Sequence, residues 1–352
     1  MIENILNRES VWEKLEHSEK PVVLYGMGNG ADMILDEFAT LGIKCSGVFA
    51  SDDFVRGQSF RGFKVEKLSD IETRLDDFTV AVGFATSLDN VIENIIEISK
   101  HHSLLAPCVP VCGKDIVNRD FILKNCAEIE EAYSLLYDEE SKNVFENSLR
   151  YMFGGELDIL LGTISAKADA FSSFFKLNSL ENYLDLGAYR GDTVAEFLHF
   201  TGGKYSSITA VEPDTKTFAK LEKFCKEIAA CTCVNACVSD TDGLVNFNNS
   251  AGRQSSISTK GKETKSLTVD TICEGRGVSY LKADIEGSEK QMLLGAAEIL
   301  KKYKPKLNIA AYHRSGDFFE IPLLINHLNP DYKIFLRRHK YIPCWDLNYY
   351  CI

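Results

Sequence analysis

Apolar runs of strand length alternate with amphipathic segments in the first third of the chain. The predicted strands are 21–25, 45–50, 79–83, 104–107 and the beginning of 65–71, which leads into a helix. The predicted helices are 1–20, 31–41 and 88–100, where apolar residues recur at helical spacing. Such an alternation is typical of a parallel sheet covered by helices, so we expect a small Rossmann-like domain.

A second and longer alternation begins at residue 183. The predicted strands are 183–186, 207–212, 232–238, 279–284, 306–312, 332–338 and 341–346. The predicted helices are 193–200, 215–228, 288–302 and 319–328, and a small β insertion is expected from 244–248 and 266–272. No helix separates the last two strands, so we expect them to pair antiparallel at a sheet edge. The fold class is therefore α/β, with two Rossmann-like domains and a seven-stranded second sheet.

The stretch between the two alternations lacks strand signals. Residues 118–175 show helical spacing and are rich in Glu, Lys and Leu, without the Gly/Ser/Pro composition of a flexible linker. We therefore predict three parts, which are a first domain, a helical connector that packs on the sheets, and a second domain. Their predicted ranges are 1–115, 116–178 and 179–352.

Composition narrows the range of functions. The net charge of −12 argues against a general nucleic-acid binder, which needs a basic face to neutralise phosphates. No signal peptide and no apolar stretch long enough to span a membrane is visible. The 11 cysteines are scattered and form no C-x-x-C pair, which favours reduced thiols in a cytoplasmic protein and no bound metal.

The turn after the first strand of the second domain carries the clearest chemical signal. The pattern from Asp185 to Gly191 is D-x-G-x-x-x-G, which lacks the glycine spacing of a dinucleotide-binding turn. The acid at the strand end would repel a phosphate but not a cationic nucleoside. S-adenosylmethionine is such a ligand, and an acid at the end of the next strand, Glu212, could bind its ribose hydroxyls.

Polar residues also follow the later strands of this domain. Ligands of open α/β sheets lie beyond the carboxyl ends of the strands, so side chains at those ends are expected to share one crevice. The predicted members of this series are Asp185, Glu212, Asp240, Asp284 and His313.

These segments resemble the FkbM-type methyltransferases. The resemblance rests first on D-L-G-A-Y-R-G-D at 185–192, V-E-P-D at 211–214 and V-S-D-T-D-G at 238–243. It continues with S-L-T-V-D-T-I at 266–272, L-K-A-D-I-E-G-S-E at 281–289 and L-G-A at 294–296. Two later segments, Tyr312-His313 and Arg337-Arg338-His339, also resemble the family. It covers roughly residues 180–342. It implies a class I S-adenosylmethionine-dependent O-methyltransferase that acts on a sugar, a glycan or a secondary metabolite.

The resemblance also assigns roles. Gly187, Ala188 and Gly191, with Tyr189 between them, would form the turn at the methionine part of the cofactor, near Asp185. Glu212 would bind both ribose hydroxyls, since a carboxylate accepts two hydrogen bonds. Ser239 and Asp240 would meet the adenine.

Methyl transfer to a hydroxyl needs an aligned acceptor that loses its proton. Asp284, Glu286 and His313 are the candidates for the general base, and His313 has the ordinary pKa closest to neutrality. The three are not ranked by the sequence. Asp284 and Glu286 could instead hold Mg²⁺, an alternative that we place behind a metal-free site.

The first domain offers a rival interpretation. Its turn at 26–30 reads G-x-G-x-G after a strand and before a helix, and Asp52 and Asp53 follow the next strand. This pattern could bind NAD or a nucleotide-sugar for an oxidoreductase or epimerase activity, although the third dinucleotide glycine is absent. A non-catalytic scaffold that binds the cofactor is a further alternative. The first domain would otherwise help to recognise the acceptor or hold a homodimer.

Overall fold

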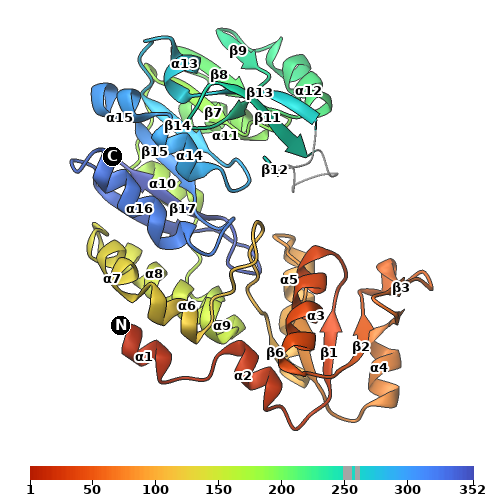
Figure 1. Ribbon diagram of the computed structural model, residues 1–352. Helices are drawn as coiled ribbons and strands as arrows, with labels where there is room; N and C mark the ends of the chain where they lie inside the picture. Colours follow the sequence, from red (N-terminus) through yellow and green to blue (C-terminus); the bar gives the residue numbers. More distant parts are fainter. Residues whose placement is uncertain (249–255, 258–261) are drawn as a thin grey trace.

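The computed structural model describes residues 1–248, 256–257 and 262–352. Figure 1 shows the first sheet and its helices as one lobe and the second sheet as another, with the connector helices beneath helix α16 (Asp317–Leu328). Among the described residues, no helix combines the length and apolar character needed to cross a membrane.

The first sheet has six strands in the order β3-β4-β2-β1-β5-β6. The strands are β1 Val22–Tyr25, β2 Cys45–Phe49, β3 Ser59–Phe60, β4 Phe63–Glu66, β5 Thr79–Val82 and β6 Ser103–Leu105. The helices are α3 Asn29–Leu41, α4 Leu68–Arg74, α5 Asp89–His101 and the 3₁₀ turn η1 Asp52–Phe54. All neighbouring strands are parallel except the short hairpin of β3 with β4, which the sequence did not predict.

The first predicted helix is two helices, α1 (Ile2–Leu6) and α2 (Val11–Glu16). The break has a local cause at Ser10. The Ser10 hydroxyl accepts a hydrogen bond from the Glu13 backbone N–H, and the Glu13 carboxylate accepts one from the Ser10 N–H. This capping box starts a new helix where the sequence pattern suggested a continuous one.

The connector is helical, as expected, and part of the core. Its helices are α6 Arg119–Lys124, α7 Cys126–Ser134, α8 Glu139–Gly154, α9 Leu157–Leu161 and α10 Lys167–Ser173. Phe145 of α8 stacks on Phe318 of α16 at a ring distance of 4.1 Å. Buried Arg337 of the second sheet pairs with Asp138 at 2.7 Å. The division into domains stays a prediction, because apolar residues of the connector and of both sheets belong to one continuous cluster.

The second sheet has seven strands in the order β16-β17-β15-β14-β7-β8-β9, which confirms the predicted fold class. The strands are β7 Asn182–Leu186, β8 Ser207–Val211, β9 Cys231–Val234, β14 Tyr280–Ala283, β15 Lys306–Ala310, β16 Ile334–Arg338 and β17 Leu347–Cys351. β17 runs antiparallel to both neighbours. The last strand was predicted at 341–346. That prediction was wrong, because 341–346 forms the loop that lets the chain insert β17 between β15 and β16.

The helices of the second sheet are α11 Asp192–Thr201, α12 Thr215–Cys225, α13 Val269–Cys273, α14 Glu289–Leu294, α15 Ala297–Tyr303 and α16. The predicted helix 288–302 is split between α14 and α15. Gly295 lies at the break, where a Cβ would stand 2.2 Å from the Ser239 carbonyl oxygen. The close approach of that neighbouring segment explains why the chain bends there.

The β insertion forms a separate small sheet in the order β10-β13-β11-β12. Its strands are β10 Cys237–Val238, β11 Gly243–Asn248, β12 Ser256–Ile257 and β13 Lys262–Leu267. The strand predicted at 232–238 is therefore two strands in two different sheets. Residues 269–273 are helical because the Thr268 hydroxyl caps α13 by accepting from the Thr271 N–H.

Candidate functional site

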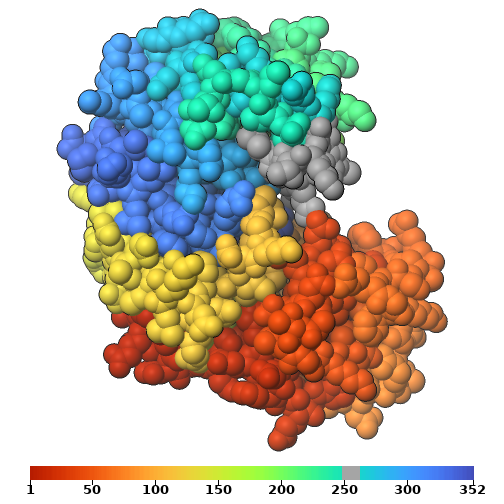
Figure 2. All heavy atoms as spheres, in the orientation of Figure 1, coloured from red at the N-terminus to blue at the C-terminus, as the bar shows by residue number. Residues whose placement is uncertain are grey.

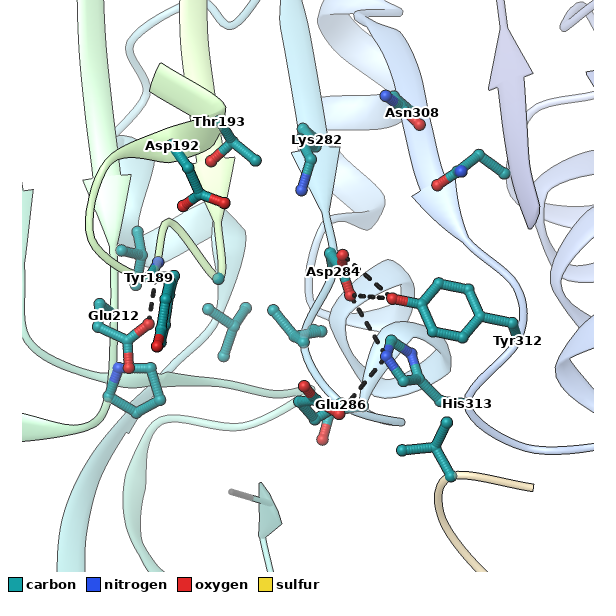
Figure 3. A pocket seen from close by; sticks show the side chains of 18 of the residues that line it. Tyr189, Asp192, Thr193, Glu212, Lys282, Asp284, Glu286, Asn308, Tyr312 and His313 are labelled. Carbon is teal, nitrogen blue, oxygen red and sulfur yellow. Dashed lines mark hydrogen bonds and ion pairs between the residues drawn. The ribbon is translucent and has the colours of Figure 1, made fainter. Parts of the chain in front are cut away.

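One cavity of about 690 Å³ opens at the carboxyl edge of the second sheet. Its walls come from the turn after β7, the end of β8, the loops after β14 and β15, and the chain around Trp345. Ala85 and Val111, which lie outside the second sheet, also line it. Figure 3 shows Glu212 and Tyr189 on one side of this cavity, and Asp284, Tyr312 and His313 on the other.

The turn after β7 brings the backbone close to its neighbours. Gly187 has a φ of +81°, and a Cβ there would lie 2.0 Å from the Asp284 carbonyl oxygen. The backbone N–H groups of Gly187 and Ala188 both donate to the Val211 carbonyl at 3.0 Å. Only a residue without a side chain fits position 187, because the backbone after β14 occupies the place of a side chain.

The other predicted turn residues do not all reach the cavity. Tyr189 lines it beside Gly187. Ala188 is fully buried, and Gly191 packs against Phe224, whose ring would stand 2.2 Å from an added Cβ. Neither Ala188 nor Gly191 is among the lining residues. Both therefore shape the turn rather than the cavity wall.

Glu212 follows β8 with its carboxylate at the cavity. One oxygen accepts from the Tyr189 N–H at 3.1 Å, and the other accepts from the Asp214 N–H at 2.9 Å. Burial raises the pKa of Glu212 to about 7, although the two N–H groups oppose the rise. The carboxylate is thus fixed in position and poised to change its charge near neutral pH.

Asp185, Ser239 and Asp240 stand apart from the cavity lining. Asp185 is fully buried and accepts from the Thr193 hydroxyl at 2.5 Å. Burial raises the pKa of Asp185 to about 6 against the opposing charge of Lys282. Asp240 is exposed and accepts from the Ser239 hydroxyl at 3.1 Å. Its strand, β10, belongs to the small sheet, so Asp240 does not follow β9 as expected.

Acidic residues surround His313 on both ring nitrogens. Nε2 lies 3.3 Å from Asp284 and 3.6 Å from Glu286, and Nδ1 lies 2.9 Å from Glu289. The ring nitrogens are within ion-pair distance but off hydrogen-bond alignment. The Tyr312 hydroxyl donates to Asp284 at 3.1 Å. The structure thus brings together the three predicted base candidates, Asp284, Glu286 and His313, as Figure 3 shows.

Electrostatics changes the expected role of the histidine. Burial disfavours charge on His313, but Glu289 and Asp284 outweigh it and raise the pKa of His313 well above its usual range. Burial likewise opposes ionisation of Asp284, but His313, Lys282 and Tyr312 together lower its pKa. These interactions favour a proton on His313 and a negative charge on Asp284. The choice of the general base among Asp284, Glu286 and His313 stays a prediction.

Among the described residues, two groups of side chains have metal-ligating atoms within 4.8 Å of one another, namely Asp284 with Glu289 and His313, and Cys225 with Cys231 and Cys233. The first group contains Glu289 in place of Glu286, which the sequence had suggested as a Mg²⁺ ligand beside Asp284. All eleven cysteines are free thiols.

The sequence reasoning missed several lining residues. The cavity is also lined by Lys282, Asn308 and Asn348. Tyr312 lines it too, and no role for this residue was predicted from the sequence. Strand periodicity could have found Lys282, because it lies two residues before Asp284 and so shares its face. Ala85 and Val111 carried no signal, since only the fold brings them here.

The loop after β6 also supports the site. The Cys112 N–H donates to the His313 carbonyl at 2.8 Å, and its thiol donates to the Glu286 carbonyl at 3.2 Å. In Figure 2 the amber segment that contains this loop lies against the blue C-terminal part of the chain. The segment before the connector therefore helps to hold the acidic cluster in place.

Comparison with known proteins shows what the part of the chain that forms this site is similar to. Residues 185–343 match the family model of the methyltransferase FkbM domain. The crystal structure of methyltransferase FkbM from Methylobacillus flagellatus KT is 19% identical with a TM-score of 0.73, covering 100% of this chain and 92% of that one. At this identity the likeness shows the fold alone.

Two further structures match about half of the chain. Fibrillarin from Aeropyrum pernix, in complex with natively bound S-adenosyl-L-methionine, is 12% identical with a TM-score of 0.34 (53% of this chain and 73% of that one). Precorrin-6y C5,15-methyltransferase from Geobacter metallireducens GS-15 is 10% identical with a TM-score of 0.34 (54% and 93%). No curated protein matches the chain.

Proposed function

We propose, from the premise that residues 185–343 form an FkbM methyltransferase domain, that this chain transfers a methyl group from S-adenosylmethionine to a hydroxyl group. One observation carries the proposal. A single cavity has the fixed carboxylate of Glu212 at one side and the cluster of Asp284, Tyr312 and His313 at the other. A donor and an acceptor could therefore meet inside it.

The cavity residues fit the proposed cofactor. Each oxygen of Glu212 has accepted one backbone N–H and keeps a lone pair for a ribose hydroxyl. Glu212, Asp214 and Asp284 make the lining acidic, which suits a cationic ligand better than a phosphate. When bound, S-adenosylmethionine supplies a methyl group on a positively charged sulfur.

Asp284 is the residue that we place first as acceptor of the hydroxyl proton. It lines the cavity on the side opposite Glu212. Tyr312 and His313 fix its position, and Glu286 lies on the same side. Proton transfer to such a positioned group contributes roughly 10²- to 10⁴-fold to a rate. Glu286 and His313 remain the alternatives.

The acceptor is proposed to be a sugar, a glycan or a secondary metabolite. This rests on the family resemblance, and the rings of Tyr341 and Trp345 in the lining would suit a ring-shaped acceptor. We further propose that the protein acts in the cytoplasm without a metal. Ala85 and Val111 would give the first part of the chain a share in acceptor recognition.

Calorimetry with S-adenosylhomocysteine tests cofactor binding. Glu212→Ala removes two hydrogen-bond acceptors, so we expect it to weaken binding about 100-fold. Asp52→Ala is the matched control, because Asp52 follows the corresponding strand of the first sheet and is exposed. The proposal fails if wild-type protein does not bind, or if Glu212→Ala binds as wild type does.

Labelled S-adenosylmethionine tests catalysis. Wild-type protein should move the label to a member of a panel of sugars and glycans, whereas a scaffold would bind the cofactor without turnover. With an acceptor in hand, Asp284→Asn should lower kcat about 10²- to 10⁴-fold and change the affinity for S-adenosylhomocysteine less than threefold. An equal loss of binding would instead give Asp284 a role in holding the cofactor.

A further inference from the structure

A row of polar side chains crosses four neighbouring strands of the second sheet, near the acidic residues around His313. Lys282 on β14 is paired in register with Asp185 on β7 and Asn308 on β15, and Asn308 is paired with Tyr350 on β17. Residues paired in this way lie on the same face of the sheet. All four are buried, and Lys282, Asn308 and Tyr350 line the cavity.

Three atoms of this row lack a hydrogen-bond partner among the described residues, namely the Lys282 ammonium nitrogen, the Asn308 side-chain oxygen and one carboxylate oxygen of Asp185. Lys282 is only 7% exposed. A buried ammonium without a partner is costly, and such groups are normally paired. Lys167, which also lines the cavity, already pairs with Glu196 at 3.2 Å. Figure 3 shows the Lys282 side chain directed into the cavity.

We propose that Lys282 anchors a carboxylate-binding subsite in this cavity, with Asn308 beside it. Asp185 and Asp284 interact electrostatically with the ammonium of Lys282, but neither accepts a hydrogen bond from it, and a bound carboxylate could do so. A monoanionic carboxylate fits better than a phosphate, because Asp284 and Asp192 line the same space and would repel a dianion more strongly. In Figure 3, Asp192 lies on the side of Lys282 away from Asn308. Its carboxylate could bind an ammonium group of the same ligand.

The inference rests on the proposed function and identifies a second contact in the same site. The carboxylate has two sources. It is either the amino-acid end of the cofactor or an acidic group on the acceptor. Lys282 is a positioning and specificity residue in either case.

Calorimetry separates the two sources. S-adenosylhomocysteine carries the amino-acid carboxylate, and 5′-methylthioadenosine has the same adenosyl part without it. If the cofactor is the source, Lys282→Met should weaken S-adenosylhomocysteine about 10- to 100-fold and methylthioadenosine less than threefold. Lys226→Met, on an exposed residue, is the matched control. If Lys282→Met still binds 5′-methylthioadenosine, the variant is folded. If it is not folded, Lys282→Gln is used in its place.

A second experiment applies if Lys282→Met changes the affinities for S-adenosylhomocysteine and for 5′-methylthioadenosine by the same factor. Wild-type protein saturated with S-adenosylhomocysteine is then titrated with D-glucuronate and D-galacturonate against glucose and galactose. Binding of a uronate but not of its parent sugar, lost in Lys282→Met, would assign the subsite to the acceptor. The inference is overturned if neither experiment shows a dependence on Lys282. Loss of methylthioadenosine binding in Glu212→Ala would then still support the proposed function.

Discussion

The two sheets of this protein each carry a strand, a glycine turn and a helix, yet the main cavity takes its lining from the second turn and from none of the first. The first unit is β1, the turn at 26–30 and α3. The second is β7, the turn at 187–191 and α11. Their difference shows that surroundings, rather than glycines alone, decide whether such a turn becomes a binding site.

The first turn is packed with aromatic rings. A Cβ on Gly26 would lie 2.4 Å from the Phe84 ring. Phe84 meets Tyr25 edge-on at 4.8 Å, and Tyr25 stacks on Phe49 at 4.5 Å. The acid that might have held a ribose, Asp52, pairs with Lys67 at 3.1 Å. The first turn is therefore packed at Gly26 by an aromatic ring, whereas the second is packed at Gly187 by a backbone carbonyl and is followed by Glu212 at the cavity.

Replacement of a glycine in each turn should give the largest difference in stability between the two regions. Gly187→Ala would place a Cβ 2.0 Å from a backbone oxygen at a φ of +81°, and backbone cannot swing away as a side chain can. We expect a loss of about 3–5 kcal/mol in the free energy of unfolding, measured by urea denaturation. Binding of S-adenosylhomocysteine should be lost with it.

Gly28→Ala is the matched control in the first turn. Gly28 also has a positive φ, +110°, but nothing lies within 4 Å of an added Cβ. The cost should be backbone strain alone, about 1–2 kcal/mol, with cofactor affinity unchanged. Equal effects of the two substitutions would contradict the contrast between the turns.

The pH dependence of binding gives the next largest effect. The pKa of Glu212 is raised to about 7 in the free protein, and ribose hydroxyls need its ionised form as acceptor. Affinity for S-adenosylhomocysteine should therefore be constant above pH 7 and fall up to about tenfold for each pH unit below it. Calorimetry between pH 5.5 and 8.5 measures this slope.

Two variants check that Glu212 is the titrating group. Glu212→Gln should bind weakly with little dependence on pH. Asp52→Asn should keep the wild-type profile, because Asp52 is exposed and outside the cavity lining. A profile that persists in Glu212→Gln would point to another group, such as Asp185, whose pKa is raised to about 6.

The sequence predicted both alternations of strands and helices because burial on both faces of a parallel sheet leaves continuous apolar runs. It also predicted that Asp185, Glu212, Asp240, Asp284 and His313 would share one crevice, since strand ends share an edge. Of these, Glu212, Asp284 and His313 line the cavity. The sequence could not place Asp240, because the apolar run at 232–238 gives no sign that β9 ends and β10 joins another sheet. Nor could it show that Phe84 fills the first turn, because that contact joins residues distant in sequence.

The smallest expected effect tests whether the first turn is truly closed. Titration of NADH with the whole chain should leave the cofactor fluorescence unchanged at protein concentrations that saturate with S-adenosylhomocysteine. The physical reason is that the Phe84 ring lies against Gly26. A saturable fluorescence change that Gly28→Ala abolishes, and that Gly203→Ala at an equally open position leaves intact, would revive the oxidoreductase alternative. It would also mean that Phe84 moves aside on binding, so the contrast between the turns would lie in ligand choice rather than in space.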